Sequence, residues 1–279
     1  MSKLIKIGRI SKNYVTRLVK KFLADNSMIL SSSIAYYFLF SIFPLMLILI
    51  SVSGFILDIP EMEMNLLEFV EERIPIIYEF TETNIEMAVQ NRRNVGIIGL
   101  IFLLIATTYV FDSIQYALNK IFKSDTHRPF IKQKLFGFLI ILMIFTLILL
   151  SFLFTGILVY LADNIFDLLN IGGGLPNLFI QAISIAIGLG FNFLIFSLVY
   201  YFGTNRTFKF RNIYIGAIVA AVIWEISKQV FIIYLDRFAA FELTYGSVGS
   251  IISFLMWLYI SSLILLLGAQ INSLTLKIK

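Results

Sequence analysis

The stretch that decides the fold is residues 213–235, "IYIGAIVAAVIWEISKQVFIIYL". Except for a short polar patch after Trp224, it is almost entirely apolar. At about 1.5 Å per residue, a helix of this length crosses the ~30 Å hydrocarbon core of a bilayer. The stretch therefore predicts a transmembrane helix that carries an acid, Glu225, and a base, Lys228, near its middle.

The rest of the chain repeats this apolar character. Its 279 residues are 59% hydrophobic and 14% charged, whereas a typical soluble domain is about 25% charged. We expect one all-α integral membrane domain over residues 1–279. The first apolar run exceeds the length of a signal-peptide core and is expected to remain as an anchor. Six transmembrane helices are predicted, over residues 28–57, 95–116, 136–161, 177–202, 213–235 and 247–274.

The distribution of Lys and Arg predicts the orientation of these helices. Seventeen of them lie in the N-terminal segment, the second and fourth connections and the C-terminal tail, but only four in the alternate connections. Because positive charge is retained on the cytoplasmic side, both termini are expected to be cytoplasmic. The expected location is the inner, cytoplasmic membrane of the cell, which the chain crosses several times.

Two segments outside the spans are predicted to be helical. In the cytoplasmic N-terminal segment 1–27, Tyr14, Leu18 and Phe22 recur at helical spacing among basic residues. This pattern fits an amphipathic helix on the inner leaflet, and a solvated basic arm is the alternative. The external connection 58–94 carries nine carboxylates and is expected to form two short helices divided by Pro75. It is interpreted either as a lid or as a solvated acidic cap.

Proline 44 lies inside the first predicted span. Because proline removes a backbone donor, we expect a helix break or kink between about Phe40 and Pro44. A kink of this kind serves either helix packing or the wall of a cavity.

Glu225 and Lys228 are the principal candidate site. An unpaired charge at the middle of a bilayer costs about 2.5–3.5 kcal/mol on insertion scales. At i, i+3 spacing the two side chains can meet on one helix face. Two interpretations remain open, namely a polar pathway for a substrate, ion or proton and a buried ion pair that fixes helix register.

Further polar residues in the spans are candidates for the same pathway. Gln229 follows Lys228, and Asp112 lies toward the cytoplasmic end of the second span. Asn192 lies deep in the fourth span, beside two glycines in "GLGFN". The sixth span ends with Gln270 and Asn272.

Several kinds of chemistry have no support in the sequence. There is no cysteine, no nucleotide-binding motif and a single histidine, His127, so no metal site, cofactor or catalytic residue is predicted. RNA hydrolysis requires clustered histidine and carboxylate ligands, which are not seen. The expected partners are membrane lipids and a lipid-like or small-molecule substrate, and not nucleic acid.

Four motifs occur in order along the chain: "SSSIAYYFLFSIFP" (31–44), "ALNKIF" (117–122), "GAIVAAVIWEISKQVFIIY" (216–234) and "YGSVGSIISFLMWLYISSLILLLGAQIN" (245–272). Together they resemble the YihY/BrkB family of bacterial inner-membrane proteins. The resemblance covers nearly the whole chain and implies six spans with both ends inside. Members of this family have also been labelled ribonuclease-like, which the residues of this chain do not support. The resemblance implies no particular activity.

The charged pair in the fifth span is the basis of the functional hypothesis, which is transport of a small or lipid-like substrate through a polar seam around Glu225 and Lys228. This seam is expected between the fifth, sixth and first spans. A membrane scaffold or envelope assembly factor, in which the same pair is structural, is the alternative.

Overall fold

The structure is a computed structural model, and it describes residues 14–57, 64, 78–124, 130–168, 174–206, 208–245 and 247–276. The described part of the chain is helical and contains no strand. The first helix described covers residues 14–24 and is called the N-terminal helix below. The others are α2 (Ser27–Leu57), α4 (Tyr78–Phe122), α5 (Phe130–Leu168), α6 (Gly174–Phe202), the 3-10 helix η2 (Phe210–Asn212), α7 (Tyr214–Tyr245) and α8 (Ser247–Thr275).

Six of these helices, α2 and α4–α8, contain segments long and apolar enough to cross a membrane. The predicted fold class, an all-α protein with six membrane spans, is therefore confirmed. The sidedness predicted from the Lys and Arg residues stays a prediction.

The helices extend beyond the predicted spans. The largest difference is at α4, which begins at Tyr78 and runs without interruption to Phe122, although a separate external helix was expected before residue 95. Residues 78–94 contain no Gly or Pro and several strong helix formers, so nothing in the sequence ends the helix there. Most of the remaining acidic connection, including Pro75, and the loop with His127 lie outside the described residues.

The chain divides into two compact units. One is Tyr37–Val110, and the other joins the chain up to Tyr36 to the chain from Phe111 onward. The smaller unit consists of the second part of α2 and the first part of α4. These segments pack closely because Gly96 lies against Ser51, and Gly99 lies against Leu47 and Ile48.

Helix α2 is not interrupted at Pro44, and the kink expected as the alternative to a break stays a prediction. Helix α2 continues through Pro44, and the proline is buried in the smaller unit. A proline removes only one backbone donor, and helices in membranes tolerate this loss when neighbouring groups satisfy the freed carbonyl.

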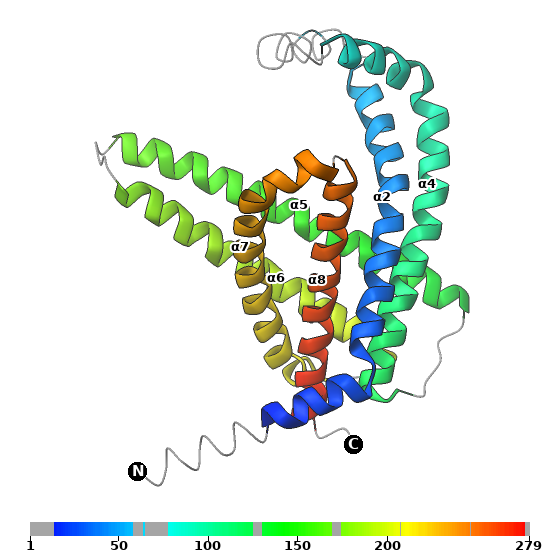
Figure 1. The fold of residues 1–279 in the computed structure, drawn as a ribbon, viewed down its shortest axis with the longest axis vertical. Coiled ribbons are helices and arrows are strands. Elements are labelled where there is room, and N and C mark those ends of the chain that lie inside the picture. Colours follow the sequence, from blue (N-terminus) through cyan, green and yellow to red (C-terminus); the bar gives the residue numbers. More distant parts are fainter. Residues whose placement is uncertain are drawn as a thin grey trace. The chain divides into compact units, whose positions relative to one another are not determined.

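The larger unit is organised around α7 and α8, which lie side by side (Figure 1). Gly216 of α7 and Gly268 of α8 face each other so closely that a Cβ atom on either would collide with the other's carbonyl oxygen. Tyr200 of α6 also meets this crossing, because its hydroxyl donates to the Leu265 carbonyl oxygen at 2.8 Å. Helix α6 then packs against α5 in a hairpin, with Phe136 near Phe202 and Phe154 near Phe191.

The N-terminal helix lies across the end of α8 in this unit (Figure 1). Its residues Leu18, Lys21, Phe22 and Asp25 are partly or largely covered, whereas Val15, Val19 and Leu23 are exposed. The amphipathic pattern thus forms a helix with one face docked on the protein.

Candidate functional site

Glu225 and Lys228 form an ion pair within α7. The Lys228 Nζ atom lies 2.5 Å from Glu225 Oε1, because residues three apart occupy neighbouring positions on a helix face. Both residues lie inside the membrane-spanning segment Tyr214–Leu235. We call Glu225 and Lys228 the intramembrane pair.

Helix α6 supplies the opposite wall for the carboxylate. The Asn192 side-chain amide donates to Glu225 Oε2 at 3.4 Å, which is a long hydrogen bond. One turn earlier, the missing side chain of Gly188 leaves room for the carboxylate, because a Cβ atom there would lie 3.4 Å from the same oxygen. The two residues of "GLGFN" that face Glu225 are therefore Gly188 and Asn192. The expected seam included the first span, whereas the observed neighbour of Glu225 is α6.

Aromatic residues flank Lys228 on the side of α8. Its ammonium lies 5.7 Å from the centre of the Trp224 ring, within the range of a cation–π interaction. The Trp224 indole N–H donates to Ser261 Oγ at 3.2 Å, and its ring lies 5.4 Å from that of Trp257. Phe231 stacks on Trp257 at 4.9 Å. The Trp257 side chain at mid-span thus packs against α7.

The two members of the pair differ in exposure. The side chain of Glu225 is 7% exposed, whereas that of Lys228 is 34% exposed. A buried carboxylate requires a nearby positive charge, which Lys228 supplies. The open part of the lysine remains available to another negatively charged group.

The other predicted pathway residues do not gather at this pair. Gln229 is exposed on α7. Asp112 of α4 forms an ion pair with Lys134 of α5 and accepts a hydrogen bond from Gln133 at 3.1 Å. The acid and the lysine at this second pair belong to different helices, which they hold together.

Asn272 is fully buried and joins α8 to the start of α7. Its Oδ1 atom accepts a hydrogen bond from the Gly216 backbone N–H at 2.7 Å, and its Nδ2 atom donates to the Ile213 carbonyl oxygen at 2.9 Å. The first N–H groups of any helix lack intrahelical acceptors. A side chain of α8 therefore caps α7, and the close Gly216–Gly268 crossing makes this reach possible.

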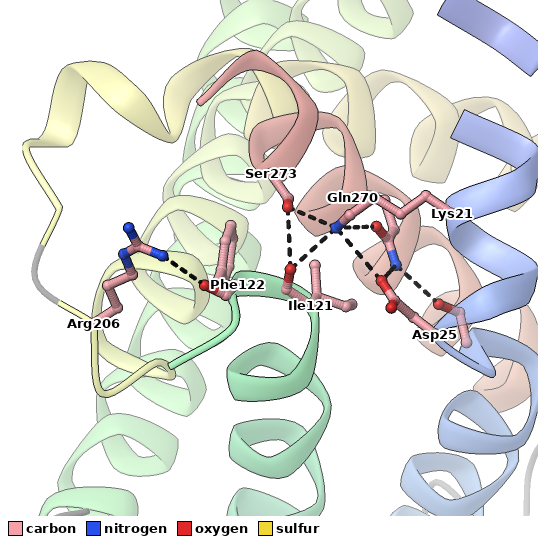
Figure 2. Close-up of polar contacts among 8 residues, drawn as sticks. Lys21, Asp25, Ile121, Phe122, Arg206, Gln270 and Ser273 are labelled. Atoms are coloured by element: carbon pink, nitrogen blue, oxygen red, sulfur yellow. Dashed lines mark hydrogen bonds and ion pairs between the residues drawn. The ribbon is translucent and has the colours of Figure 1, made fainter. Parts of the chain in front are cut away.

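Gln270 is also fully buried, and it holds the N-terminal helix (Figure 2). Its Oε1 atom accepts from Lys21 Nζ at 2.9 Å, and its Nε2 atom donates to Asp25 Oδ2 at 2.7 Å and Ser27 Oγ at 3.3 Å. The amide is thus satisfied on both sides, as a buried polar group requires.

Lys21 is the centre of this group (Figure 2). Besides Gln270, its ammonium donates to Ser273 Oγ at 2.6 Å and to the Ile121 carbonyl oxygen at 3.1 Å, and it lies 3.4 Å from Asp25 Oδ2. Burial lowers the pKa of Lys21, partly offset by the negative charge of Asp25. The terminal cluster, as we call it, consists of Lys21, Asp25, Ser27, Gln270, Asn272 and Ser273.

Two cations satisfy the carbonyl groups at the end of α4. Lys21 bonds the Ile121 carbonyl oxygen, and the Arg206 guanidinium donates to that of Phe122 at 2.9 Å (Figure 2). Positive groups are favourable at a helix C-terminus because the helix dipole is negative there. The preceding turn is bonded through Asn119 Oδ1, which accepts from Thr204 Oγ1 and from the Asn205 N–H.

Sequence analysis did not select Lys21 or Ser273. One signal was present for Lys21, which lies on the same helix face as the apolar Leu18 and Phe22 and four residues before an acid, Asp25. Ser273 offered no comparable signal. In the described part of the chain, no three His, Asp or Glu residues lie close enough together to hold a metal ion.

The six spans and their intramembrane polar groups define a multi-pass α-helical membrane protein. A family model described as "Virulence factor BrkB" matches residues 18–278, and the chain therefore belongs to the BrkB family. The bacterial inner membrane expected for the chain fits this family.

Curated relatives carry two kinds of name. The putative ribonuclease-like protein YfkH of Bacillus subtilis is 27% identical over 274 residues, which cover 96% of both chains. The UPF0761 membrane protein PM1616 of Pasteurella multocida is 31% identical over 68% of this chain, and the match spans 57% of that protein. A UPF0761 membrane protein of Aeromonas salmonicida is 26% identical over 90% of this chain and 84% of its own. No solved structure matches the chain.

Proposed function

We propose that the protein translocates a small or lipid-like substrate with a negatively charged group along the α6–α7–α8 face that carries the intramembrane pair. The observation that carries this proposal is the 34% exposure of the Lys228 side chain within a membrane span. A lysine that only neutralised Glu225 would gain nothing from this exposure, because charge facing hydrocarbon is costly.

The surroundings of Lys228 support the same proposal. Trp224 gives one side of the ammonium an aromatic surface, and Glu225 with Asn192 holds the other side in place. An anionic head group would bind to the open side of the ammonium, and an apolar tail would remain in the bilayer. Gln270 and Asn272 are not available to a substrate in this way, because both are 0% exposed and their side chains are bonded to protein groups.

A scaffold function is favoured by a different observation. Glu225 Oε1 contacts Lys228, Oε2 accepts a hydrogen bond from Asn192, and Gly188 leaves room for the carboxylate beside α6. A pair held in this way fixes the register of α6 on α7 without any substrate. The two functions predict different results when the charges are removed: transport predicts a lower translocation rate, and a scaffold predicts a lower thermal stability.

A lipid-translocation assay separates them. Purified protein is reconstituted at equal amounts of folded protein into liposomes that contain a fluorescent anionic phospholipid in one leaflet. Glu225→Gln and Lys228→Met are compared with wild type, and transport predicts a loss of at least about tenfold in rate. Asp112→Asn with Lys134→Met is the control, because it removes another ion pair within the spans, the one between α4 and α5.

Unchanged translocation in both single variants would contradict the proposal. Absence of any translocation by wild type, together with lowered thermal stability of Glu225→Gln, would instead support the scaffold. A similar loss in the control would show that the α6–α7–α8 face has no special role.

A further inference from the structure

The outward face of the N-terminal helix combines apolar and basic residues. Val15, Val19 and Leu23 are each about half exposed and, at i, i+4 and i+8, form one stripe. Arg17 and Lys20 are exposed beside this stripe. The opposite face is held by Lys21 in the terminal cluster. The stripe is therefore presented outward by a helix whose position is fixed.

The turn before α7 repeats the combination at the same end of the larger unit. Phe210 and Tyr214 are exposed apolar side chains, and Lys209 and Arg211 are exposed cations. Asn272 bonds the start of α7 within the same α8 turn that holds Lys21. The basic turn and the N-terminal helix are thus attached to one short segment of α8.

The end of α4 contributes a third basic element. Lys120 and Lys123 are exposed, and the positive charge of Lys123 further lowers the pKa of Lys21. Lys123 has φ 50°, the left-handed conformation that favours glycine. The hydrogen bonds from the Ser124 and Lys123 N–H groups to the Asn119 and Lys120 carbonyl oxygens form a Schellman motif there. A lysine at this position is disfavoured for the helix end and places a charge at the surface.

Acidic residues do not balance these cations among the described residues. Asp25 is bonded to Lys21 and Gln270, and Asp112 is bonded to Lys134. The exposed cations therefore form a surface of one sign, interleaved with exposed apolar side chains. We call this surface the basic face, and its cations are Arg17, Lys20, Lys120, Lys123, Lys209 and Arg211.

We propose that the basic face binds the head groups of anionic phospholipids, with the Val15–Val19–Leu23 stripe inserted among their acyl chains. Phosphate groups match the cations in charge, and each Lys or Arg near an anionic membrane surface contributes about 1 kcal/mol, or roughly fivefold in affinity. The aliphatic stripe favours a bilayer over a nucleic acid, because aliphatic side chains gain nothing at a phosphodiester backbone. This site is separate from the intramembrane pair and does not depend on the transport proposal.

The test is lipid titration of the purified full chain in neutral detergent, followed by native mass spectrometry. The probes are phosphatidylglycerol and phosphatidylcholine with the same acyl chains. Wild type is expected to bind phosphatidylglycerol at least about tenfold more tightly. The triple variant Arg17→Gln, Lys20→Gln, Lys123→Gly should lose most of this preference and keep its affinity for phosphatidylcholine.

Two controls distinguish lost binding from lost folding. Arg93→Gln removes an exposed cation from the other end of the α4 span and should keep the lipid preference. Lys123→Gly alone should weaken phosphatidylglycerol binding while raising the unfolding temperature in phosphatidylcholine, because glycine fits the left-handed conformation.

Three results would overturn the proposal. The first is equal affinity of wild type for both lipids, and the second is an undiminished lipid preference in the triple variant. The third is a single-stranded RNA that binds to wild type and displaces phosphatidylglycerol, with binding lost in the triple variant, which would make the basic face a nucleic-acid surface.

Discussion

The intramembrane pair and the terminal cluster both bury polar groups, but they satisfy them differently. The terminal cluster surrounds Lys21 with two carbonyl or amide oxygens, a hydroxyl and a carboxylate. The intramembrane pair relies on one short ion contact and one long hydrogen bond, and leaves Lys228 partly open. Since a fully bonded group has nothing left for a ligand, buried polarity alone does not indicate function. The number of bonded partners and the remaining exposure distinguish the two regions.

The largest expected effect is at Lys21. Lys21→Met would leave Asp25, Gln270, Ser273 and a helix-end carbonyl without their shared cation, at a cost of about 3 kcal/mol in unfolding free energy. Lys228→Met should cost less than Lys21→Met, because it removes one ion contact and one cation–π contact, whereas Lys21 serves four polar groups. Denaturant unfolding in detergent measures both. Equal losses would remove the contrast between the two regions.

Glycine substitutions sharpen the same comparison. Gly216→Ala should cost about 2–3 kcal/mol, because the added Cβ meets the Gly268 carbonyl oxygen and the Asn272 amide, neither of which can move freely. Gly188→Ala should change stability by less than about 1 kcal/mol, since its Cβ would reach only ordinary contact with the Glu225 carboxylate. Thermal unfolding of the two variants compares the regions. A larger loss at Gly188 would contradict the looser packing inferred for the intramembrane pair.

The end of α4, beside the terminal cluster, allows a smaller test. Lys123→Gly should stabilise the protein by about 1 kcal/mol, because its φ of 50° is unfavourable for a side chain with a Cβ atom. Lys120→Gly removes the same charge one turn earlier, inside the helix, and should destabilise by about 1 kcal/mol. Opposite shifts in unfolding temperature are expected. Shifts of the same sign would show that charge outweighs backbone conformation.

The smallest expected effect is a pH dependence from Lys21. Its pKa is lowered in the folded protein from the ordinary value of 10.5, so the unfolded chain binds more protons just below that pH. Stability should therefore rise as pH increases from below 10.5 toward it. The measurement is the difference in unfolding free energy between wild type and Lys21→Met across this range. A slope that is the same in wild type and in Lys21→Met would contradict the assignment to Lys21.

Much of the fold follows from local sequence. Runs such as residues 213–235 need only length and apolarity to predict a span, because every backbone group in hydrocarbon must be bonded within a helix. The positions at which the helices begin and end cannot be predicted from hydropathy in the same way. Helix α4 continues from Tyr78 because polar helix formers extend it beyond the apolar segment. Helix α2 likewise continues through Pro44, which is buried in the smaller unit.

The candidate site was only partly accessible from sequence. The contact of Glu225 with Lys228 follows from i, i+3 spacing on one helix. The contact of Glu225 with Asn192 joins two helices, and no periodicity states which residues of different helices meet. For the same reason Asp112, Gln270 and Asn272 could be recognised as polar residues in apolar spans but not assigned partners.

The sequence by itself determined that this chain is a six-span membrane protein with opposite charges in its fifth span, because hydropathy and helical spacing are local properties. Only the tertiary structure decided which polar side chains are fully bonded to protein groups and which remain partly exposed. Lys21 and Lys228 are both helical lysines paired with an acid one turn away, yet one is enclosed by the ends of α4 and α8 and the other is partly exposed. That difference depends on which helices pack against each lysine, and packing between distant segments is not encoded in any one of them.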